Sequence, residues 1–386
     1  MALHFERSEY AARLSAARAT LKREKLDALL IFAQESLYYL TGFDTSGFVF
    51  FQCAVLTADD QPIILLTRRP DLEQAHRTSI IEDVRLWYDS EEADPSVELL
   101  DILLEKGLEQ SCIGIELRTF GLTADKYELV RQRLADHCTL VDASHVVRSL
   151  RLVKSPAEIA YVRRAAELAD QSLDAMLAEA KPGAFEGAIA AAGAVPMLIG
   201  GGDPPPSGPV LGSGDRALLI RSATGYRHLD SIDQLTLEFA ASYRHYCACL
   251  MRTVAIGQSH DVQRGMFEVT RDALDAMTAA ARPGRPLGEI DDAHRRVYDQ
   301  TGYGAHRMSA CGYSLGALYR PTWMDVPPML YSGNPLPALP GMVLFLHAIL
   351  IDAPRNLAMS LGHTILIGVN GAEVLSTRRP EYRVCL

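Results

Sequence analysis

The sequence predicts an α/β protein of two domains, residues 1–150 and residues 151–386. Three observations predict this fold class: apolar strand-like runs alternate with helical patterns in the first part, a helix-start signal follows directly, and one phrase of the second part recurs. A chain of 386 residues is long enough to bury more than one hydrophobic core.

The first domain is predicted from alternating periodicities. Residues 8–25 carry apolar side chains at helical spacing, and a buried-strand run follows at 28–32. Later strands are predicted in four runs: 47–51, 54–56, 62–66 and 113–116. Strands separated by helices are typical of an α/β domain.

The domain boundary carries a capping box. Ser155 is a predicted N-cap, Pro156 suits the first helical position, and Glu158 lies three residues after the cap. An amphipathic helix is therefore predicted from Pro156 to about Ala180.

The second domain contains a faint internal repeat. A Pro-Gly phrase followed by Gly and Ile occurs at 181–189 and again at 282–290. In both copies a helical pattern precedes the phrase and another follows it. The repeat predicts two α/β halves related by a pseudo-twofold axis.

Composition excludes several functional classes. The net charge is −10 and the sequence has no block of Lys and Arg, so it predicts no nucleic-acid partner. No run reaches the roughly 18 apolar residues of a spanning helix, and the charged N-terminus lacks a signal-peptide core. The seven scattered cysteines are typical of reduced thiols. We therefore expect a cytoplasmic protein without a membrane partner.

Several motifs resemble one enzyme family. Residues 237–257 predict a β-hairpin ending in Arg-Thr-x-x-x-Gly, and glycine-bounded runs follow at 312–316 and 341–347. With the Lys-Ser-Pro-x-Glu-Ile phrase at 154–159, they resemble the creatinase/prolidase/methionine-aminopeptidase family across nearly the whole chain. The resemblance implies a creatinase-type N-terminal domain, a pita-bread catalytic domain and a homodimer.

The places of the family's metal ligands carry other residues. Metal-using members have aspartates where this chain has Glu238 and Cys249. Tyr313 stands in place of a histidine and His347 in place of a glutamate, and the last glutamate aligns near Gly362. One carboxylate, a thiol, a phenol and an imidazole do not make a dinuclear site. We therefore expect no metal and no cofactor.

Glu238, Tyr313 and His347 are the candidate catalytic residues, because three separate motifs bring them to one site. A carboxylate on an apolar strand has a raised pKa, which suits an acid, a base or a nucleophile. The alternatives are a structural Glu238 paired with an arginine, a core tyrosine and a buried, hydrogen-bonded histidine.

Other polar residues are candidates for substrate binding. Arg221 can bind a substrate carboxylate or neutralise Glu238. Cys247 and Cys249 point to one face of a strand, where packing, substrate contact, a catalytic thiol and a soft-metal site remain open. The candidate binding residues are Arg221, Tyr246, Cys249, Trp323 and His363.

The most specific likeness is to ectoine hydrolases. It rests on Glu238, a Cys-Gly-Tyr-x-x-Gly run at 311–316 and a Tyr-x-Pro-x-Trp run at 319–323. It implies a metal-independent hydrolase acting on a C–N bond of a small polar cyclic amidine or guanidino-type substrate, with Glu238 as nucleophile or general base. Two alternatives stay open: a lyase, isomerase or cyclase using the same pocket, and a non-catalytic pita-bread binding protein.

Overall fold

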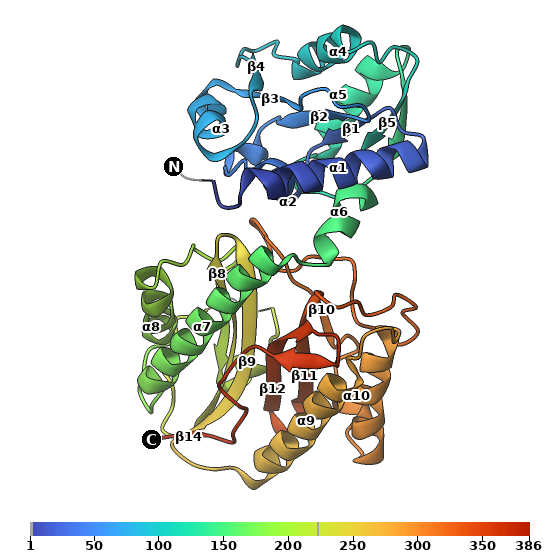
Figure 1. Cartoon of the computed structure of the whole chain (residues 1–386). Helices are drawn as coiled ribbons and strands as arrows, with labels where there is room; N and C mark the ends of the chain where they lie inside the picture. Colours follow the sequence, from blue (N-terminus) through green and yellow to red (C-terminus); the bar gives the residue numbers. More distant parts are fainter. Residues whose placement is uncertain (1–2, 222–223) are drawn as a thin grey trace. The chain divides into compact units, whose positions relative to one another are not determined.

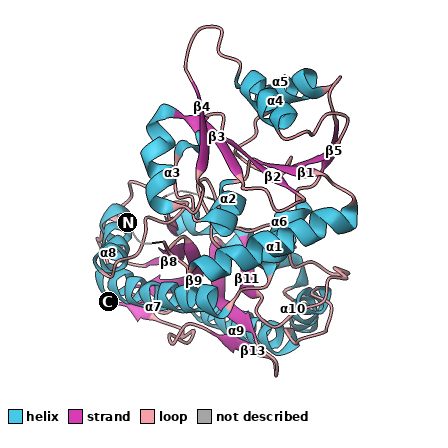
Figure 2. Ribbon diagram, turned by 45° about the horizontal axis from the view of Figure 1, so that its top comes forward, coloured by secondary structure: helices cyan, strands magenta, loops and turns pink. Residues whose placement is uncertain are grey.

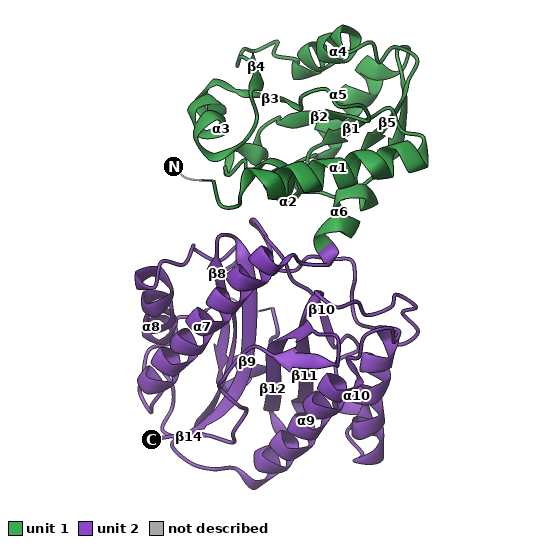
Figure 3. Cartoon of the chain, in the orientation of Figure 1, with its two compact units in different colours: residues 1–151 green, residues 152–386 purple. Residues whose placement is uncertain are grey.

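The computed structural model describes residues 3–221 and 224–386. The chain divides into two compact units, Met1–Arg151 and Leu152–Leu386 (Figure 3). Each unit has a sheet and helices of its own (Figures 1 and 2). No helix of the described residues has the length and apolar character needed to cross a lipid bilayer.

The first unit contains a six-stranded mixed sheet in the order β4-β3-β2-β1-β5-β6. The strands are β1 (Ala28–Ile31), β2 (Cys53–Thr57), β3 (Ile64–Arg68), β4 (Asp83–Trp87), β5 (Cys112–Ile115) and β6 (Thr139–Asp142). The α-helices are α1 (Arg7–Glu24), α2 (Gln34–Thr41), α3 (Leu72–Thr78), α4 (Pro95–Glu105), α5 (Ala124–Leu134) and α6 (His145–Leu152). Strand β2 runs antiparallel to β1 and β3, and the remaining pairs are parallel.

Both faces of this sheet are buried. Leu29 and Ile31 of β1 belong to one hydrophobic cluster, and Ala28 and Leu30 belong to another. Successive side chains of a strand point to opposite faces, so a strand covered on both sides is apolar throughout. This explains the uninterrupted apolar run from which β1 was predicted.

The strand predicted at 47–51 is wrong. The structure has a short 3₁₀-helix, η1 (Gly47–Val49), and both Val49 and Phe50 are exposed. The hydroxyl of Thr45 donates to Asp71 Oδ1 at 2.6 Å and accepts from the Gly47 backbone N–H at 2.9 Å. Side-chain hydrogen bonds of this kind hold a turn and compete with strand pairing.

The second unit contains an eight-stranded sheet whose main path is β10-β11-β12-β9-β8-β7. The strands are β7 (Val210–Ser213), β8 (Asp233–Tyr243), β9 (Tyr246–Ile256), β10 (Gly312–Ser314), β11 (Val343–Asp352), β12 (Leu357–Ile367), β13 (Ala372–Val374) and β14 (Val384–Cys385). The α-helices are α7 (Pro156–Glu179), α8 (Glu186–Ile199), α9 (Asp261–Ala280) and α10 (Gly288–Gln300). Short 3₁₀ segments elsewhere in the chain are η2 (Arg69–Asp71), η3 (Gly214–Leu218), η4 (Gly304–His306) and η5 (Ala353–Arg355).

The capping box that opens α7 is confirmed. Ser155 accepts from the Glu158 backbone N–H at 3.2 Å, and Glu158 Oε2 accepts from the Ser155 N–H at 2.9 Å. Pro156 lies at the start of the helix, where a missing N–H costs nothing. The helix therefore begins at the predicted residue.

The internal repeat corresponds to two structurally similar halves. Helix α7 packs on β8 and β9 and is flanked by α8, while α9 packs on β11 and β12 and is flanked by α10 (Figure 1). Gly183 and Gly284 have φ of +80° and +79°, in the region that favours glycine. Each donates its N–H to a carbonyl, at 2.9 Å for Gly183 and 2.8 Å for Gly284. The repeated phrase thus marks the same tight turn in each half.

The predicted hairpin is formed by β8 and β9. Its turn residues Arg244 and His245 both have positive φ, which a tight two-residue hairpin turn requires. Alternation along β8 sends Leu237 and Phe239 into the cluster beneath α7 and α8. Glu238 consequently faces the other side of the sheet.

Candidate functional site

A cavity of about 490 Å³ lies in the second unit, on the side of the sheet that Glu238 faces. That volume is within the range of small-molecule sites. Among its lining residues are five of the predicted site residues: Arg221, Glu238, Tyr313, Trp323 and His347.

The strand register brings Glu238 and His347 to one row. Glu238 pairs with Met251, Met251 pairs with Gly362, and Gly362 pairs with His347. Directly paired residues project from the same face of a sheet. The row crosses β8, β9, β12 and β11, so it joins residues more than a hundred positions apart in sequence.

Tyr313 lies in the next row on that face. It pairs with Phe345, which pairs with Thr364. The Thr364 hydroxyl accepts from the Cys249 N–H at 2.8 Å and donates to the Cys249 carbonyl at 3.0 Å. Gly312 has φ of +155°, and a Cβ there would lie 2.2 Å from the Phe345 carbonyl oxygen, so β10 needs glycine at this close approach.

Tyr246 and His363 lie on the opposite face, which corrects their assignment to substrate binding. The Tyr246 hydroxyl donates to Glu158 Oε1 at 2.7 Å, and His363 Nε2 lies 3.0 Å from Thr278 Oγ1. Both contacts are with helices that cover the sheet. Strand alternation is the reason. Tyr246 is an odd number of positions from Met251 on β9, and His363 directly follows Gly362 on β12, so both side chains point away from the cavity face.

A directed hydrogen-bond chain ends on Glu238. The Trp323 indole N–H donates to the Tyr313 hydroxyl oxygen at 2.8 Å. An indole nitrogen can only donate, so Tyr313 accepts this bond and keeps its own proton for another acceptor. That acceptor is the carboxyl group of Glu238. The hydrogen bond from Tyr313 lowers the pKa of this carboxyl.

Burial dominates the electrostatics of Glu238. The residue is 9% exposed, and burial raises the pKa of its carboxyl to about 7, although the charge of Arg221 and the bond from Tyr313 lower it. Both the carboxylate and the neutral acid are therefore present near neutral pH. Arg221 lines the cavity and is exposed, and it neutralises Glu238 only in part.

His347 is a neutral imidazole in this site. Burial, with smaller contributions from His294 and Arg221, lowers its pKa to about 3. Its Nδ1 is buried and has no hydrogen-bond partner. A buried polar atom without a partner costs free energy, so this nitrogen is available to a bound molecule.

Neither Cys247 nor Cys249 lines the cavity. Burial raises the pKa of the Cys247 thiol to about 12 and that of Cys249 well above its usual range. A nucleophilic cysteine needs the opposite shift. The nearby His245 ring stacks on Tyr319 with centroids 4.3 Å apart. These features favour packing among the alternatives left open for the two thiols.

The cavity residues do not fit a dinuclear metal centre. Of the described residues that line it, Glu238 alone carries a carboxylate, and burial keeps the Cys249 thiol and the Tyr313 phenol protonated. A Cβ on Gly362 would lie 2.8 Å from the Phe345 ring, so that ring fills the place of a further side chain. Hard dications need several oxygen ligands, and bridging two of them needs shared carboxylates.

Several cavity residues were not predicted from the sequence. Met251 lies between Glu238 and His347 on the sheet, and the loops add further apolar and hydroxyl side chains. They are Ser207, Ile220, Met308, Ser309, Thr322, Met324 and Met329, and strands β7 and β11 add Val210 and Ile349. Strand alternation would have identified Met251, whereas the loop residues belong to no periodic pattern.

Comparisons with known proteins agree with this architecture. Residues 160–368 match the model of metallopeptidase family M24, and residues 13–153 match the creatinase/prolidase N-terminal domain. The chain is 26% identical to an ectoine hydrolase of Halomonas elongata over 398 residues, covering 97% of each chain. It is 27% identical to a Xaa-Pro dipeptidase of Pyrococcus furiosus over 236 residues, covering 61% of this chain and 66% of that protein.

Solved structures share the fold. A prolidase from Thermococcus sibiricus superposes with a TM-score of 0.86 and 20% identity, covering 97% of this chain and 99% of that chain. A dipeptidase from Mycobacterium ulcerans gives a TM-score of 0.83 at 24% identity, covering 99% of each chain.

Proposed function

The chain belongs to metallopeptidase family M24, and we propose that it is a hydrolase that cleaves a C–N bond without a metal in the Glu238 cavity. One observation carries the proposal. A buried carboxylate with a pKa of about 7 faces a cavity of about 490 Å³ and receives a hydrogen bond from a phenol whose oxygen is already engaged by Trp323. General bases are most effective when their pKa lies near the working pH.

The chemistry follows from these groups. In the general-base form, the Glu238 carboxylate takes a proton from a water molecule while the oxygen of that water forms a bond to the amidine carbon. The tetrahedral adduct then breaks its C–N bond, and the protonated carboxyl returns the proton to the departing nitrogen. In the nucleophilic form, a carboxylate oxygen bonds to the amidinium carbon first. One C–N bond of that carbon then breaks, and the departing nitrogen takes a proton from the other nitrogen and leaves as an amine. Water hydrolyses the remaining imidate ester to an amide and releases Glu238. Both forms add one water to the substrate.

The phenol and imidazole assist this reaction. Burial raises the pKa of Tyr313 well above its usual range, so its hydroxyl remains a proton donor throughout. Its hydrogen bond favours the carboxylate form of Glu238, which is the form that acts as base or nucleophile. The unpartnered Nδ1 of His347 can orient the substrate or the attacking water.

The charges of the cavity suggest the substrate class. Glu238 is complementary to an amidinium or guanidinium group, and Arg221 is complementary to a carboxylate. Methionine and isoleucine side chains between them suit a short aliphatic or ring carbon skeleton. A small zwitterionic cyclic amidine combines these features, and the similarity to ectoine hydrolase over 97% of both chains supports this choice.

Turnover assays with a substrate panel test the proposal. The purified chain is incubated with cyclic amidine acids, guanidino acids and Xaa-Pro dipeptides, and products are identified by mass spectrometry. We expect a cyclic amidine to gain the mass of one water and to open, at a rate unchanged by brief exposure to a chelator. Turnover of dipeptides alone, or a rate that needs added metal, contradicts the proposal. An unchanged product mass would indicate an isomerase or cyclase, and a mass loss a lyase.

A further inference from the structure

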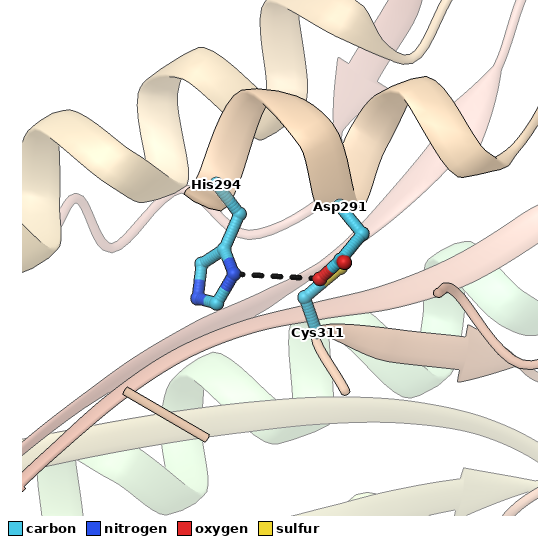
Figure 4. Close-up of side chains that lie close together, drawn as sticks. All are labelled: Asp291, His294 and Cys311. Carbon is cyan, nitrogen blue, oxygen red and sulfur yellow. Dashed lines mark ion pairs between the residues drawn. The ribbon is translucent and has the colours of Figure 1, made fainter. Parts of the chain in front are cut away.

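A second cluster of ionisable side chains lies outside the cavity lining. Asp291 and His294 are three residues apart on α10, so they share one face of that helix. Cys311 comes from the segment that enters β10. One potential ligand atom from each lies within 4.8 Å of the others (Figure 4). Helix and sheet thus meet at a carboxylate, an imidazole and a thiol.

The cluster is fully buried and incompletely hydrogen-bonded. Asp291, His294 and Cys311 are at most 2% exposed. Among the described residues, Asp291 Oδ1 and His294 Nδ1 meet each other as an ion pair at 3.5 Å without a hydrogen bond, and His294 Nε2 has no hydrogen-bond partner. Burying polar atoms that lack a hydrogen bond costs free energy. A bound species that interacts with them would remove that cost.

We propose that this cluster binds one Zn²⁺ ion through Asp291 Oδ1, His294 Nδ1 and Cys311 Sγ. Oxygen, nitrogen and sulfur donors together suit zinc, and three protein ligands leave the fourth tetrahedral position to water. At zinc–ligand distances of about 2.0–2.3 Å, tetrahedral neighbours lie about 3.4 Å apart. The Asp291–His294 separation of 3.5 Å already matches that edge, so mainly the thiol has to move.

The surroundings of the cluster define the chemistry of binding. The Ser332 N–H holds Asp291 Oδ2 at 3.1 Å, which leaves Oδ1 pointing at His294. Without metal, the Cys311 thiol donates to the Leu330 carbonyl at 3.8 Å, and burial raises the pKa of the thiol well above the usual range. Zinc therefore displaces one proton from sulfur as the Zn–S bond forms. The Arg307 guanidinium, 3.8 Å from Oδ1, opposes a dication, and the thiolate offsets that repulsion.

The proposed ion is structural, because it ties α10 to the edge of the sheet. The Cys311 carbonyl accepts from the His347 N–H at 2.9 Å, so the cluster supports the strand that carries a cavity residue. No hydrolytic step requires it. The expectation that the chain holds no metal then applies to the Glu238 cavity alone. Zinc binding at Asp291 and hydrolysis at Glu238 are separate proposals, and either can be wrong without the other.

Metal content and a cobalt spectrum test the site on the full chain. The protein is stripped with chelator, reconstituted with Zn²⁺ or Co²⁺, desalted and analysed for bound metal. We expect about one ion per chain, a thiolate-to-cobalt charge-transfer band in the near ultraviolet and a higher melting temperature with zinc. Cys311→Ser should lose the band, and His294→Asn should reduce bound metal at least about tenfold. Cys53→Ser, a control at a fully buried thiol of the first unit, should keep both.

Three results overturn the proposal. They are less than about a tenth of an ion per wild-type chain after reconstitution, a cobalt spectrum without a thiolate band, and a band that survives in Cys311→Ser. If Cys311→Ser does not fold, the wild-type spectrum and the metal content of His294→Asn decide the question.

Discussion

Each unit of the chain contains a buried glutamate with the same unusual acidity. Burial raises the pKa of Glu116 in the first unit and of Glu238 in the second to about 7. Glu116 Oε1 accepts from the Ser36 hydroxyl at 2.6 Å, and Oε2 accepts from the Ala33 N–H at 2.9 Å. Its carboxylate is held at the N-terminus of α2, where a negative charge is favoured.

Glu238 differs in what its oxygens face. Its carboxyl accepts a hydrogen bond from the phenol of Tyr313 and lines a cavity of about 490 Å³. The two residues show that a shifted pKa alone does not separate a structural carboxylate from a reactive one. What separates them is their surroundings: both oxygens of Glu116 accept hydrogen bonds within the protein, whereas Glu238 lines a cavity that can hold a ligand.

The largest expected effect is on turnover. Glu238→Gln keeps the shape of the side chain and removes the base, so the rate should fall at least about 100-fold. Glu116→Gln should retain activity within about threefold at a temperature where it is folded, because its carboxylate is hydrogen-bonded to Ala33 and Ser36 of the first unit. Steady-state kinetics of both variants, on the substrate that the panel assay identifies, measure this. Equal losses would show that the contrast between the two glutamates is false.

A smaller effect is expected for the residues that assist Glu238. Tyr313→Phe and His347→Asn should each lower kcat by about tenfold, because each removes one hydrogen bond without removing the base. Tyr246→Phe and His363→Asn are matched controls on the opposite face of the same strands, and they should leave kcat unchanged. Activity lost in the controls rather than in the first pair would reverse the assignment of the two faces.

The dependence of stability on pH should also distinguish the glutamates. Glu238 has a pKa near 7 when folded and about 4.5 when unfolded, so the folded chain binds the extra proton between these values and stability falls as pH rises through that window. Glu238→Gln removes this loss. The free energy of unfolding of this variant should exceed that of wild type by up to about 3 kcal/mol at pH 8 and should equal it at pH 4.

Glu116→Gln should not share that gain. Both oxygens of Glu116 accept hydrogen bonds, so an amide must turn its NH₂ group toward one of the donors. Its melting temperature should fall at pH 8. Thermal melts of both variants across pH 4–8 give the answer, and a parallel rise in both would mean that desolvation alone governs the two sites.

The smallest expected effect is that of a chelator. Because the cavity residues do not fit a dinuclear centre, brief chelation should leave kcat within about 20% of the untreated value. The melting temperature should nevertheless fall if zinc occupies the Asp291 cluster. Loss of kcat that is restored by added metal in the Cys311→Ser variant would place the catalytic metal in the cavity.

Much of the fold could be predicted from local chemistry. Three predicted features depend only on residues close in sequence, and the structure has all three. They are the capping box at Ser155, the repeated turn glycines and the β8–β9 hairpin. The apolar run at 47–51 was wrongly predicted as a strand. The turn there is held by a hydrogen bond between Thr45 and Asp71, which are too far apart in sequence for a local pattern to show.

The candidate site was predictable only in part. Motif resemblance brought Glu238, Tyr313 and His347 together, and the strand register places them on one face. Counting parity along β9 and β12 would have placed Tyr246 and His363 on the other. The cluster of Asp291, His294 and Cys311 depends on packing between a helix and a distant segment, which no sequence pattern encodes.

The bond between Trp323 and Tyr313 has an optical consequence. The chain has two tryptophans, and the other, Trp87, lies in the first unit with its indole N–H bonded to the Phe51 carbonyl. In a Trp87→Phe variant, all indole emission comes from a ring at the cavity wall, one hydrogen bond from the phenol that faces Glu238. Entry of a ligand changes the polarity around that ring, so the intrinsic fluorescence of this variant reports binding even of molecules that are never turned over.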